Sequence, residues 1–274
     1  MKLINLKANT FVKPSKQPLI IGFFDGLHRG HQVLFRGLKT NKFDILTFIN
    51  VPSKSSSFIY SNNLRIADLI QLKPNHLYIL DLKVFNMRAA KFANFIKEHI
   101  KPEIIYIGKN FKFGSDHKKY QEFVNNNLKV RTFTITPQHS STKAKALLKH
   151  GKIQELNKLL LDPYNIVGKV VIGKKLGRKL GYRTANVMID KNCIAPANGS
   201  YYGYTYVNDV KFESAIFVRN HLVETHIFNF NRDIYGNVIT IEFKKFHQAP
   251  NKTASFNNLK KILDKKIKNI KVSF

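Results

Sequence analysis

The chain contains no tryptophan, a single cysteine and no long hydrophobic run. One thiol cannot form an internal disulfide or complete a cysteine-based zinc site, so we expect Cys193 to be structural and the compartment to be the reducing cytoplasm. No apolar stretch reaches the length of about 18 residues that a transmembrane helix needs, and no apolar segment follows Met1 and Lys2. We therefore expect neither a membrane partner nor secretion.

Acidic residues are scarce, because 17 Asp and Glu stand against 46 Lys and Arg, a formal net charge of +29. Such a charge is typical of nucleic-acid-binding proteins. However, only 9 of the 46 basic residues are arginine, which direct base readout favours, and the lysines are spread along the chain. Abundant Lys, Asn, Ile and Phe indicate a bias towards A/T-rich codons. The charge favours anionic ligands such as nucleotides, and a nucleic-acid partner is not expected.

A short apolar run, Leu19–Ile21, precedes a glycine-rich stretch, Gly22–His31, and a helical pattern then extends to Leu38. A strand that turns into a helix leaves backbone N–H groups at the helix start, where the helix dipole favours an anion. Glycine allows close approach, and imidazole N–H groups reach phosphate oxygens. The stretch predicts a phosphate site. A histidine pair is also compatible with helix capping or with half of a metal site, but no Cys, Glu or third His lies nearby in the sequence to complete the ligand set.

Strand patterns alternate with helical patterns over the first half of the chain. Residues 1–18 predict an opening strand and loop, strands follow at 43–49, 76–82 and 104–107, and helices at 63–72, 89–99 and 151–161. This alternation predicts a doubly wound parallel sheet. Beyond Asp162–Tyr164 the pattern changes to short strands and turns, which predicts an antiparallel β-barrel, with a lysine-rich helix over 257–270. The expected fold class is thus α/β plus β, with domains 1–161 and 162–274.

The stretch Gly22-Phe23-Phe24-Asp25-Gly26-Leu27-His28-Arg29-Gly30-His31 resembles the G-x-F-D-G-x-H-x-G-H signature of bacterial FAD synthetases. Those bifunctional proteins join an H-x-G-H nucleotidyltransferase domain to a riboflavin kinase domain. The resemblance implies that His28 and His31 are catalytic and stabilise charge on the phosphates of ATP. It also implies nucleotide binding by Gly22, Phe23, Asp25 and Gly30.

Two later segments extend the resemblance within the first half. Gly108–Gly114 is similar to the family's G-x-[DN]-F-x-F-G segment, which implies flavin binding by Asn110 and Phe113, and an aromatic face suits an isoalloxazine ring. Ser140–Lys145 is similar to S-S-T-x-[IV]-R, although on its own it would be a helix N-cap. Lysine replaces the family's arginine there, which keeps the charge and loses the planar fork. The implied nucleotide-binding residues are Ser141, Thr142 and Lys145.

The second half resembles riboflavin kinases. Gly168–Asn186 matches G-x-V-x-x-G-x-x-x-G-R-x-L-G-[FY]-P-T-A-N with intact spacing, except that Arg183 takes the place of proline. The resemblance implies that Thr184 and Asn186 hold Mg²⁺ and ATP phosphates, since hydroxyl and amide oxygens suit this hard cation. The implied ATP-binding residues are Gly173, Arg178, Gly181 and Thr184.

Glu224–Phe230 and Asp233–Gly236 resemble the kinase segments E-x-H-[IL]-x-x-F and D-[IL]-Y-G. A glutamate at the start of a strand is usually an exposed strand residue. The resemblance implies instead that Glu224 is the general base that takes the proton of the riboflavin ribityl 5′-hydroxyl. Phosphoryl transfer needs this alignment together with neutralisation of the phosphate charge.

The resemblance covers nearly the whole chain and implies two reactions with small-molecule substrates. Riboflavin would be phosphorylated by ATP to FMN, and FMN would be adenylylated by a second ATP to FAD, with Mg²⁺ as the cofactor. The chain departs from the family at Ile49–Val51 (T-F-x-P-H-P in the family), Lys145, Arg183 and a shortened loop before Glu224. These departures keep open that only one activity is retained. The alternative to an enzyme is a non-catalytic protein that binds flavin or nucleic acid. The oligomeric state is not determined by the sequence.

Overall fold

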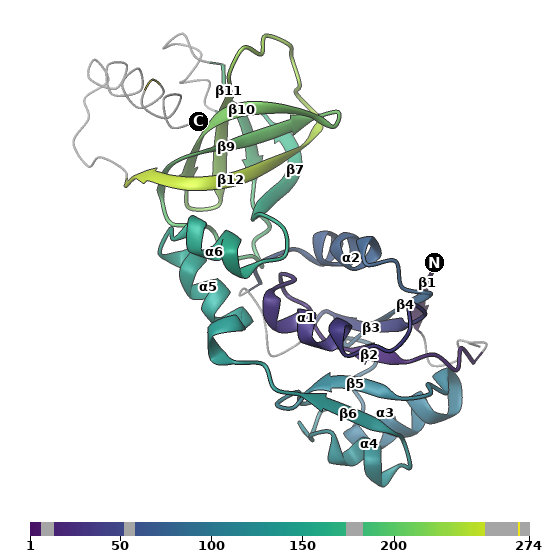
Figure 1. Ribbon diagram of the computed structural model, residues 1–274. Helices are drawn as coiled ribbons and strands as arrows, with labels where there is room; N and C mark the ends of the chain where they lie inside the picture. The colour runs from purple at the N-terminus through teal and green to yellow at the C-terminus, as the bar shows by residue number, and fades with distance from the viewer. Residues whose placement is uncertain (7–13, 52–57, 174–182, 250–267, 269–274) are drawn as a thin grey trace. The chain divides into compact units, whose positions relative to one another are not determined.

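A computed structural model describes residues 1–6, 14–51, 58–173, 183–249 and 268 (Figure 1). By its internal contacts the chain forms two compact units. The first comprises Met1–Ser55 and Ser61–Ser141, and the second comprises Ser56–Tyr60 and Thr142–Phe274. Arg178, Gly181 and almost all of the helix predicted over 257–270 lie outside the described residues.

The first unit is built on a parallel sheet, as the sequence predicts. Its strands are β1 (Lys2–Leu6), β2 (Leu19–Ile21), β3 (Asp44–Ile49), β4 (His76–Asp81), β5 (Ile105–Gly108) and β6 (Val130–Phe133). They lie in the order β1-β4-β3-β2-β5-β6, and every neighbouring pair is parallel. The helical elements are α1 (Arg29–Arg36), α2 (Asn62–Gln71), α3 (Ala89–Phe95) with the π-helical turn η2 (Ile96–Ile100), α4 (Gln121–Asn125) and the 3₁₀ turn η3 (Pro137–His139).

Strand β2 lies inside the sheet and is covered on both of its faces. All three of its residues are buried, as is typical of a central parallel strand. Leu19 and Ile21 pack into a core that includes Phe92 of α3 and Ile96 of η2, while Ile20 points to the opposite face.

The strand order reverses at β2, which lies between β3 and β5. From β2 the chain continues through β3 and β4 on one side, whereas β5 and β6 lie on the other. Ligands of open α/β sheets bind at such a point, beyond the carboxyl ends of the strands. The stretches Gly22–His31 and Gly108–Gly114 directly follow β2 and β5, so both lie at this switch point.

The second unit contains a closed antiparallel barrel, as predicted. Its strands are β7 (Asn165–Val171), β8 (Ala185–Met188), β9 (Gly199–Val207), β10 (Val210–Arg219), β11 (Leu222–Ile227) and β12 (Val238–Gln248), in the order β10-β11-β8-β7-β12-β9 (Figure 1). Burial alternates along β11, where Val223, Thr225 and Ile227 are buried and their neighbours are partly exposed. The helices α5 (Ser141–Lys149) and α6 (Ile153–Leu159) precede the barrel, and α6 contacts β12.

A short segment from the first half of the chain also packs in the barrel unit. The N–H of Phe58 donates to the carbonyl of Asn192 at 3.0 Å, and the N–H of Ile194 donates to the carbonyl of Phe58 at 2.7 Å. The ring of Tyr60 stacks on that of Tyr164, with the centroids 5.6 Å apart. The barrel unit is therefore built from two separate pieces of the chain. Of the helices that the structure describes, none is long and apolar enough to cross a membrane.

Candidate functional site

The loop after β2 brings three predicted site residues together. His28 lies at the N-cap of α1, and its ring stacks on that of His31 with the centroids 3.7 Å apart. The backbone N–H of His28 donates to Nδ1 of His31 over 3.4 Å. On its other side, Nε2 of His28 pairs with Oγ of Ser141 at 3.1 Å, across 113 residues of sequence. This group is called the histidine cluster below.

The surroundings of the cluster determine the protonation state of His28 and the tautomer of a neutral His31. His28 is 1% exposed, and burial, followed by the charge of His139, lowers its pKa from 6.5 to about 4. The ring is therefore neutral at pH 7. Its Nδ1 is buried and has no hydrogen-bond partner among the described residues. Because Nδ1 of His31 accepts a hydrogen bond, the proton of a neutral His31 lies on Nε2.

Small and buried residues shape the turn around the cluster. A Cβ on Gly30 would lie 2.0 Å from the carbonyl oxygen of His139, and one on Gly22 would lie 2.6 Å from the ring of Phe24. Asp25 is buried in the same turn. Thr142 and Lys145 follow Ser141 on α5, where Thr142 is exposed and Lys145 half-buried.

An aromatic pocket of about 370 Å³ lies in the first unit, next to the ends of β3, β4 and β5. Phe113, predicted to bind flavin, is part of its wall, and so is Phe23, which the sequence assigns to the nucleotide. Asn110 lies exposed in the turn after β5 and is not among the lining residues. Hydrophobic residues form most of the wall: Phe23, Phe48, Val51, Leu80, Leu82, Phe85, Met87, Phe92, Phe111 and Phe113.

Sequence reasoning missed most of this aromatic wall. Phe48 stacks on Phe111 with the centroids 6.1 Å apart, and Phe92 packs against Phe113 at 5.6 Å. The available signal was the abundance of phenylalanine, 22 residues, together with its position at strand ends such as Phe48 in β3. Lys112 and His117 add polar groups to the lining.

The departure at Ile49–Val51 changes the loop after β3. Asn50 has a left-handed backbone with φ of 54°, which proline cannot adopt. Its amide donates to both carboxylate oxygens of Asp81, at 3.0 Å each. Val51 lines the aromatic pocket, in the position where the family has histidine. This loop therefore differs in backbone and chemistry from the family pattern.

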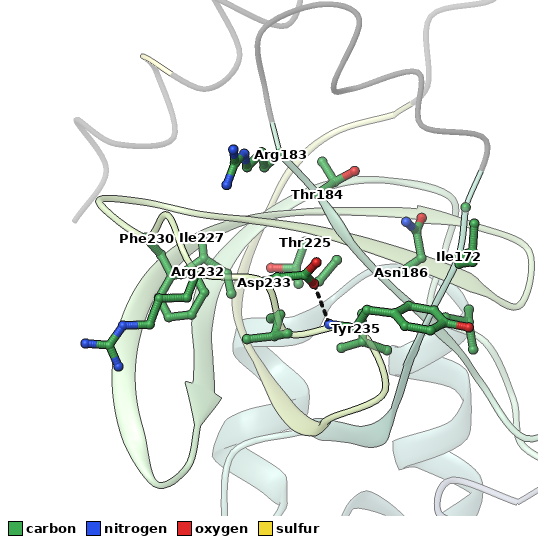
Figure 2. A pocket seen from close by; sticks show the side chains of 15 residues that line it. Ile172, Arg183, Thr184, Asn186, Thr225, Ile227, Phe230, Arg232, Asp233 and Tyr235 are labelled. Carbon is green, nitrogen blue, oxygen red and sulfur yellow. Dashed lines mark hydrogen bonds between the residues drawn. The ribbon is translucent and has the colours of Figure 1, made fainter.

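A second pocket, of about 480 Å³, lies in the barrel unit (Figure 2). Gly173, Thr184 and Asn186 of the predicted ATP and metal site line it. In Figure 2 the guanidinium groups of Arg183 and Arg232 lie to the left, and the Thr184 hydroxyl and Asn186 amide to the right. We call this cavity the barrel pocket.

Glu224 lies beside the barrel pocket rather than in its lining. It pairs directly with Asn186 between the antiparallel strands β11 and β8, so the two side chains share one face of the sheet. Burial raises the pKa of Glu224 above its ordinary value, and the charge of Arg219 opposes part of that rise. Two predicted residues that are 38 positions apart thus meet at one edge of the pocket.

Arg183, which replaces the family's proline, is held at both ends. Its carbonyl accepts a hydrogen bond from Nδ1 of His226 at 2.8 Å, and its guanidinium donates to the carbonyl of Asn231 at 3.0 Å. Proline has no side-chain donor and could not make the second bond. The bond joins the segment before β8 to the loop between β11 and β12, and both contribute residues to the barrel pocket.

Comparisons with known proteins agree with this division into two sites. Residues 12–147 match the family model described as FAD synthetase, and residues 160–274 match the one described as riboflavin kinase. The crystal structure of a protein titled macrolide-efflux protein, from Streptococcus pneumoniae, superposes with a TM-score of 0.86 and 25% identity, covering 99% of each chain.

Two curated relatives show how far the similarity extends. The "Trifunctional protein RibF/MnmA" of Mycoplasmoides gallisepticum is 33% identical over 96% of this chain, which spans only 41% of that longer protein. The bifunctional riboflavin kinase/FMN adenylyltransferase of Mycoplasma pneumoniae is 30% identical, over 92% of this chain and 96% of its own length. The chain therefore belongs to the family of bifunctional riboflavin kinase/FMN adenylyltransferases, with one FAD synthetase domain and one riboflavin kinase domain.

Proposed function

We propose that this protein makes FAD from riboflavin in two ATP-dependent steps, one at each pocket. In the barrel unit, the riboflavin 5′-hydroxyl attacks the γ-phosphorus of ATP, and FMN and ADP are formed. In the first unit, an FMN phosphate oxygen attacks the α-phosphorus of a second ATP, and FAD and pyrophosphate are formed. The observation that carries the proposal is that each unit contains a ligand-sized pocket whose lining includes motif residues. We place both steps in the cytoplasm, consistent with a sequence that has a single cysteine and so no internal disulfide.

For adenylyl transfer, we assign the histidine cluster to the phosphates of ATP. A phosphate oxygen can only accept, so a neutral His28 would donate from Nδ1 and accept at Nε2 from the Ser141 hydroxyl. This arrangement would satisfy the buried Nδ1, and His31 would donate from Nε2. Both donors would stabilise the charge that develops as pyrophosphate leaves. Nucleotide contacts are assigned to Gly22, Asp25, Gly30, Thr142 and Lys145, and the flavin ring to the aromatic pocket, with Asn110 nearby.

For phosphoryl transfer, we assign the nucleotide to the barrel pocket and the proton to Glu224. Ionised Glu224 would accept the proton of the riboflavin 5′-hydroxyl while the new P–O bond forms. Its pairing with Asn186 would place this base beside the residues assigned to the phosphates. Gly173 and Thr184 complete the described part of that set, to which we add Arg178 and Gly181 from the motif.

The residues of the barrel pocket fit Mg²⁺ bound together with ATP. The Thr184 hydroxyl and the Asn186 amide are neutral oxygen donors, and a Cβ on Gly173 would lie 2.5 Å from that amide, so the glycine leaves this space open. No cluster of three or more His, Cys, Asp or Glu suited to a metal occurs within the described ranges. The remaining ligands would therefore come from phosphate and water. When bound, Mg²⁺ would neutralise phosphate charge.

Product analysis by chromatography tests the proposal. The purified chain and Mg-ATP would be incubated with riboflavin in one tube and with FMN in another. We expect FAD in both. If riboflavin yields only FMN and added FMN is unchanged, only the kinase is retained. If FAD forms in the FMN tube but riboflavin is not converted, only the transferase is retained. No conversion in either tube would support a non-catalytic binding protein, and salt-dependent retention of RNA or DNA would then identify a nucleic-acid partner.

The substitution Gly30→Ala is expected to reduce FAD formation from FMN by at least about tenfold. Its Cβ would lie 2.0 Å from the His139 carbonyl, so the segment that leads to Ser141 must move away from His28. Steady-state rates of both reactions would be measured on the same sample. Gly37→Ala is not a suitable control, because it would meet Phe133, so Ala146→Gly on the exposed face of α5 serves instead. An unchanged rate in Gly30→Ala would contradict the assigned role of this contact.

A further inference from the structure

A buried arginine on α2 lies outside every motif that the sequence singles out. Arg65 is 1% exposed and is among the largest fully buried side chains of the described residues. Its guanidinium donates to the carbonyl oxygens of Phe23 and Phe48, the latter at 2.7 Å, and to Oδ1 of Asn62 at 3.0 Å. A planar fork of donors can bind two carbonyls at once, which a lysine ammonium on a flexible stem does less well.

Both carbonyl partners of Arg65 belong to residues that line the aromatic pocket. The guanidinium also lies over the ring of Phe23, 3.9 Å from its centroid. A cation at this distance is attracted to the face of the ring and restrains its orientation. Phe23 thus forms part of the pocket wall while its backbone and its ring are both held by Arg65.

The backbone beyond Phe23 has contacts besides Arg65, so the histidine cluster keeps its support when Arg65 is replaced. Phe24 follows Phe23 and has a left-handed backbone with φ of 54°, which a non-glycine residue keeps only when its surroundings enforce it. The ring of Phe24 packs edge-on against His31, with the centroids 5.2 Å apart. The carbonyl before this residue is that of Phe23, which also accepts a hydrogen bond from the Thr47 hydroxyl at 3.3 Å.

We infer that Arg65 is a positioning residue for adenylyl transfer, which fixes Phe23 as a flavin-contacting wall of the aromatic pocket. The inference rests on the proposed function, because it takes FMN as the occupant of this pocket. Arg65 acts on FMN through Phe23 and does not itself line the pocket. Its loss therefore weakens the use of FMN more than the use of ATP. A purely structural role for Arg65 would instead affect both substrates together.

The experiment compares wild type, Arg65→Lys, Phe23→Leu and the double variant in FAD formation by the full chain. KM and kcat are measured with FMN varied at saturating ATP and with ATP varied at saturating FMN. We expect each single variant to raise KM for FMN about tenfold, and to change KM for ATP less than about twofold. Because Arg65 acts through Phe23, the double variant should raise KM for FMN no further than the more impaired of the two single variants does. Arg36→Lys, at an exposed arginine of α1, is the matched control and should stay near wild type.

Three results would overturn the inference. One is a parallel rise in both KM values, which would indicate general damage to the fold. Another is a double variant whose effect is the product of the single effects, which would make Arg65 and Phe23 independent. The third is an Arg36→Lys variant as impaired as Arg65→Lys. A wild-type chain that forms no FAD from FMN would overturn the proposed function and this inference together.

Discussion

The variant His28→Ala is expected to form FAD from FMN roughly 100- to 1,000-fold more slowly than wild type, and to phosphorylate riboflavin at the wild-type rate. Loss of one preorganised donor to a developing charge has an effect of this size. His28 lies in the first unit, whereas the residues assigned to the kinase belong to the barrel unit, so the second activity reports on the integrity of each sample.

The lowered pKa of His28 also predicts how the stability of the protein depends on pH. Its pKa is lowered to about 4, so the folded protein keeps the ring neutral between pH 4 and the ordinary value of 6.5, where the unfolded chain binds a proton. Stability contributed by neutral His28 is therefore complete above pH 6.5 and is lost as the pH falls towards 4. In denaturant titrations between pH 4 and 6.5, the free energy of unfolding of His28→Ala should vary less steeply with pH than that of wild type, because the variant lacks this group.

Two variants test the hydrogen bonds assigned to the ring. His28→Asn keeps a polar group close to the position of Nδ1 and should recover part of the rate that alanine loses. Ser141→Ala removes the partner of Nε2 and should lower FAD formation less than His28→Ala does. His150→Ala, at an exposed position after α5, is the matched control. Wild-type rates in His28→Ala would contradict the assignment of the histidine cluster to ATP.

The turn after β2 could be predicted because its signals are local. The apolar run Leu19–Ile21, the glycines and the two histidines all lie within a short stretch, and each has a direct meaning for a strand, a turn and a helix start. The strand–helix alternation and the change of pattern after Asp162 were equally local. They predict the parallel sheet and the barrel, both of which are confirmed.

Features that depend on distant contacts could not be predicted in this way. Arg65 reads as a polar position of an amphipathic helix, and its burial follows from carbonyl groups on β3 and after β2. The short helix α4 and the edge strand β6 were missed because lysine and asparagine residues interrupt their apolar pattern. The packing of Phe58 against Asn192 and Ile194 joins segments more than a hundred residues apart, and no periodicity reports such a pairing.

The variant Glu224→Gln is expected to phosphorylate riboflavin roughly 100- to 10,000-fold more slowly, the range for loss of a general base, while FAD formation from FMN is unchanged. Glutamine preserves size and polarity but cannot accept the proton of the 5′-hydroxyl. Glu213→Gln is the matched control, because Glu213 is an exposed glutamate on the neighbouring strand β10. Equal rates in Glu224→Gln and Glu213→Gln would show that Glu224 is not the base.

The environment of Glu224 also predicts how the kinase responds to pH. Only the ionised carboxylate can accept a proton, and burial raises the pKa of Glu224, so the rate should fall with decreasing pH sooner than it would with an exposed glutamate. Arg219 favours the ionised form, and Arg219→Gln should therefore raise that pKa further and move the acidic limb of the rate profile to higher pH. The free energy of unfolding changes in the opposite direction to the rate and falls as the pH rises. The folded state binds an extra proton between pH 4.5 and the raised pKa, and it is destabilised as this proton is lost. If the rate of riboflavin phosphorylation depends on pH in the same way in wild type and Arg219→Gln, the acidic limb does not report the ionisation of Glu224. A shift of that limb to higher pH would show that it does.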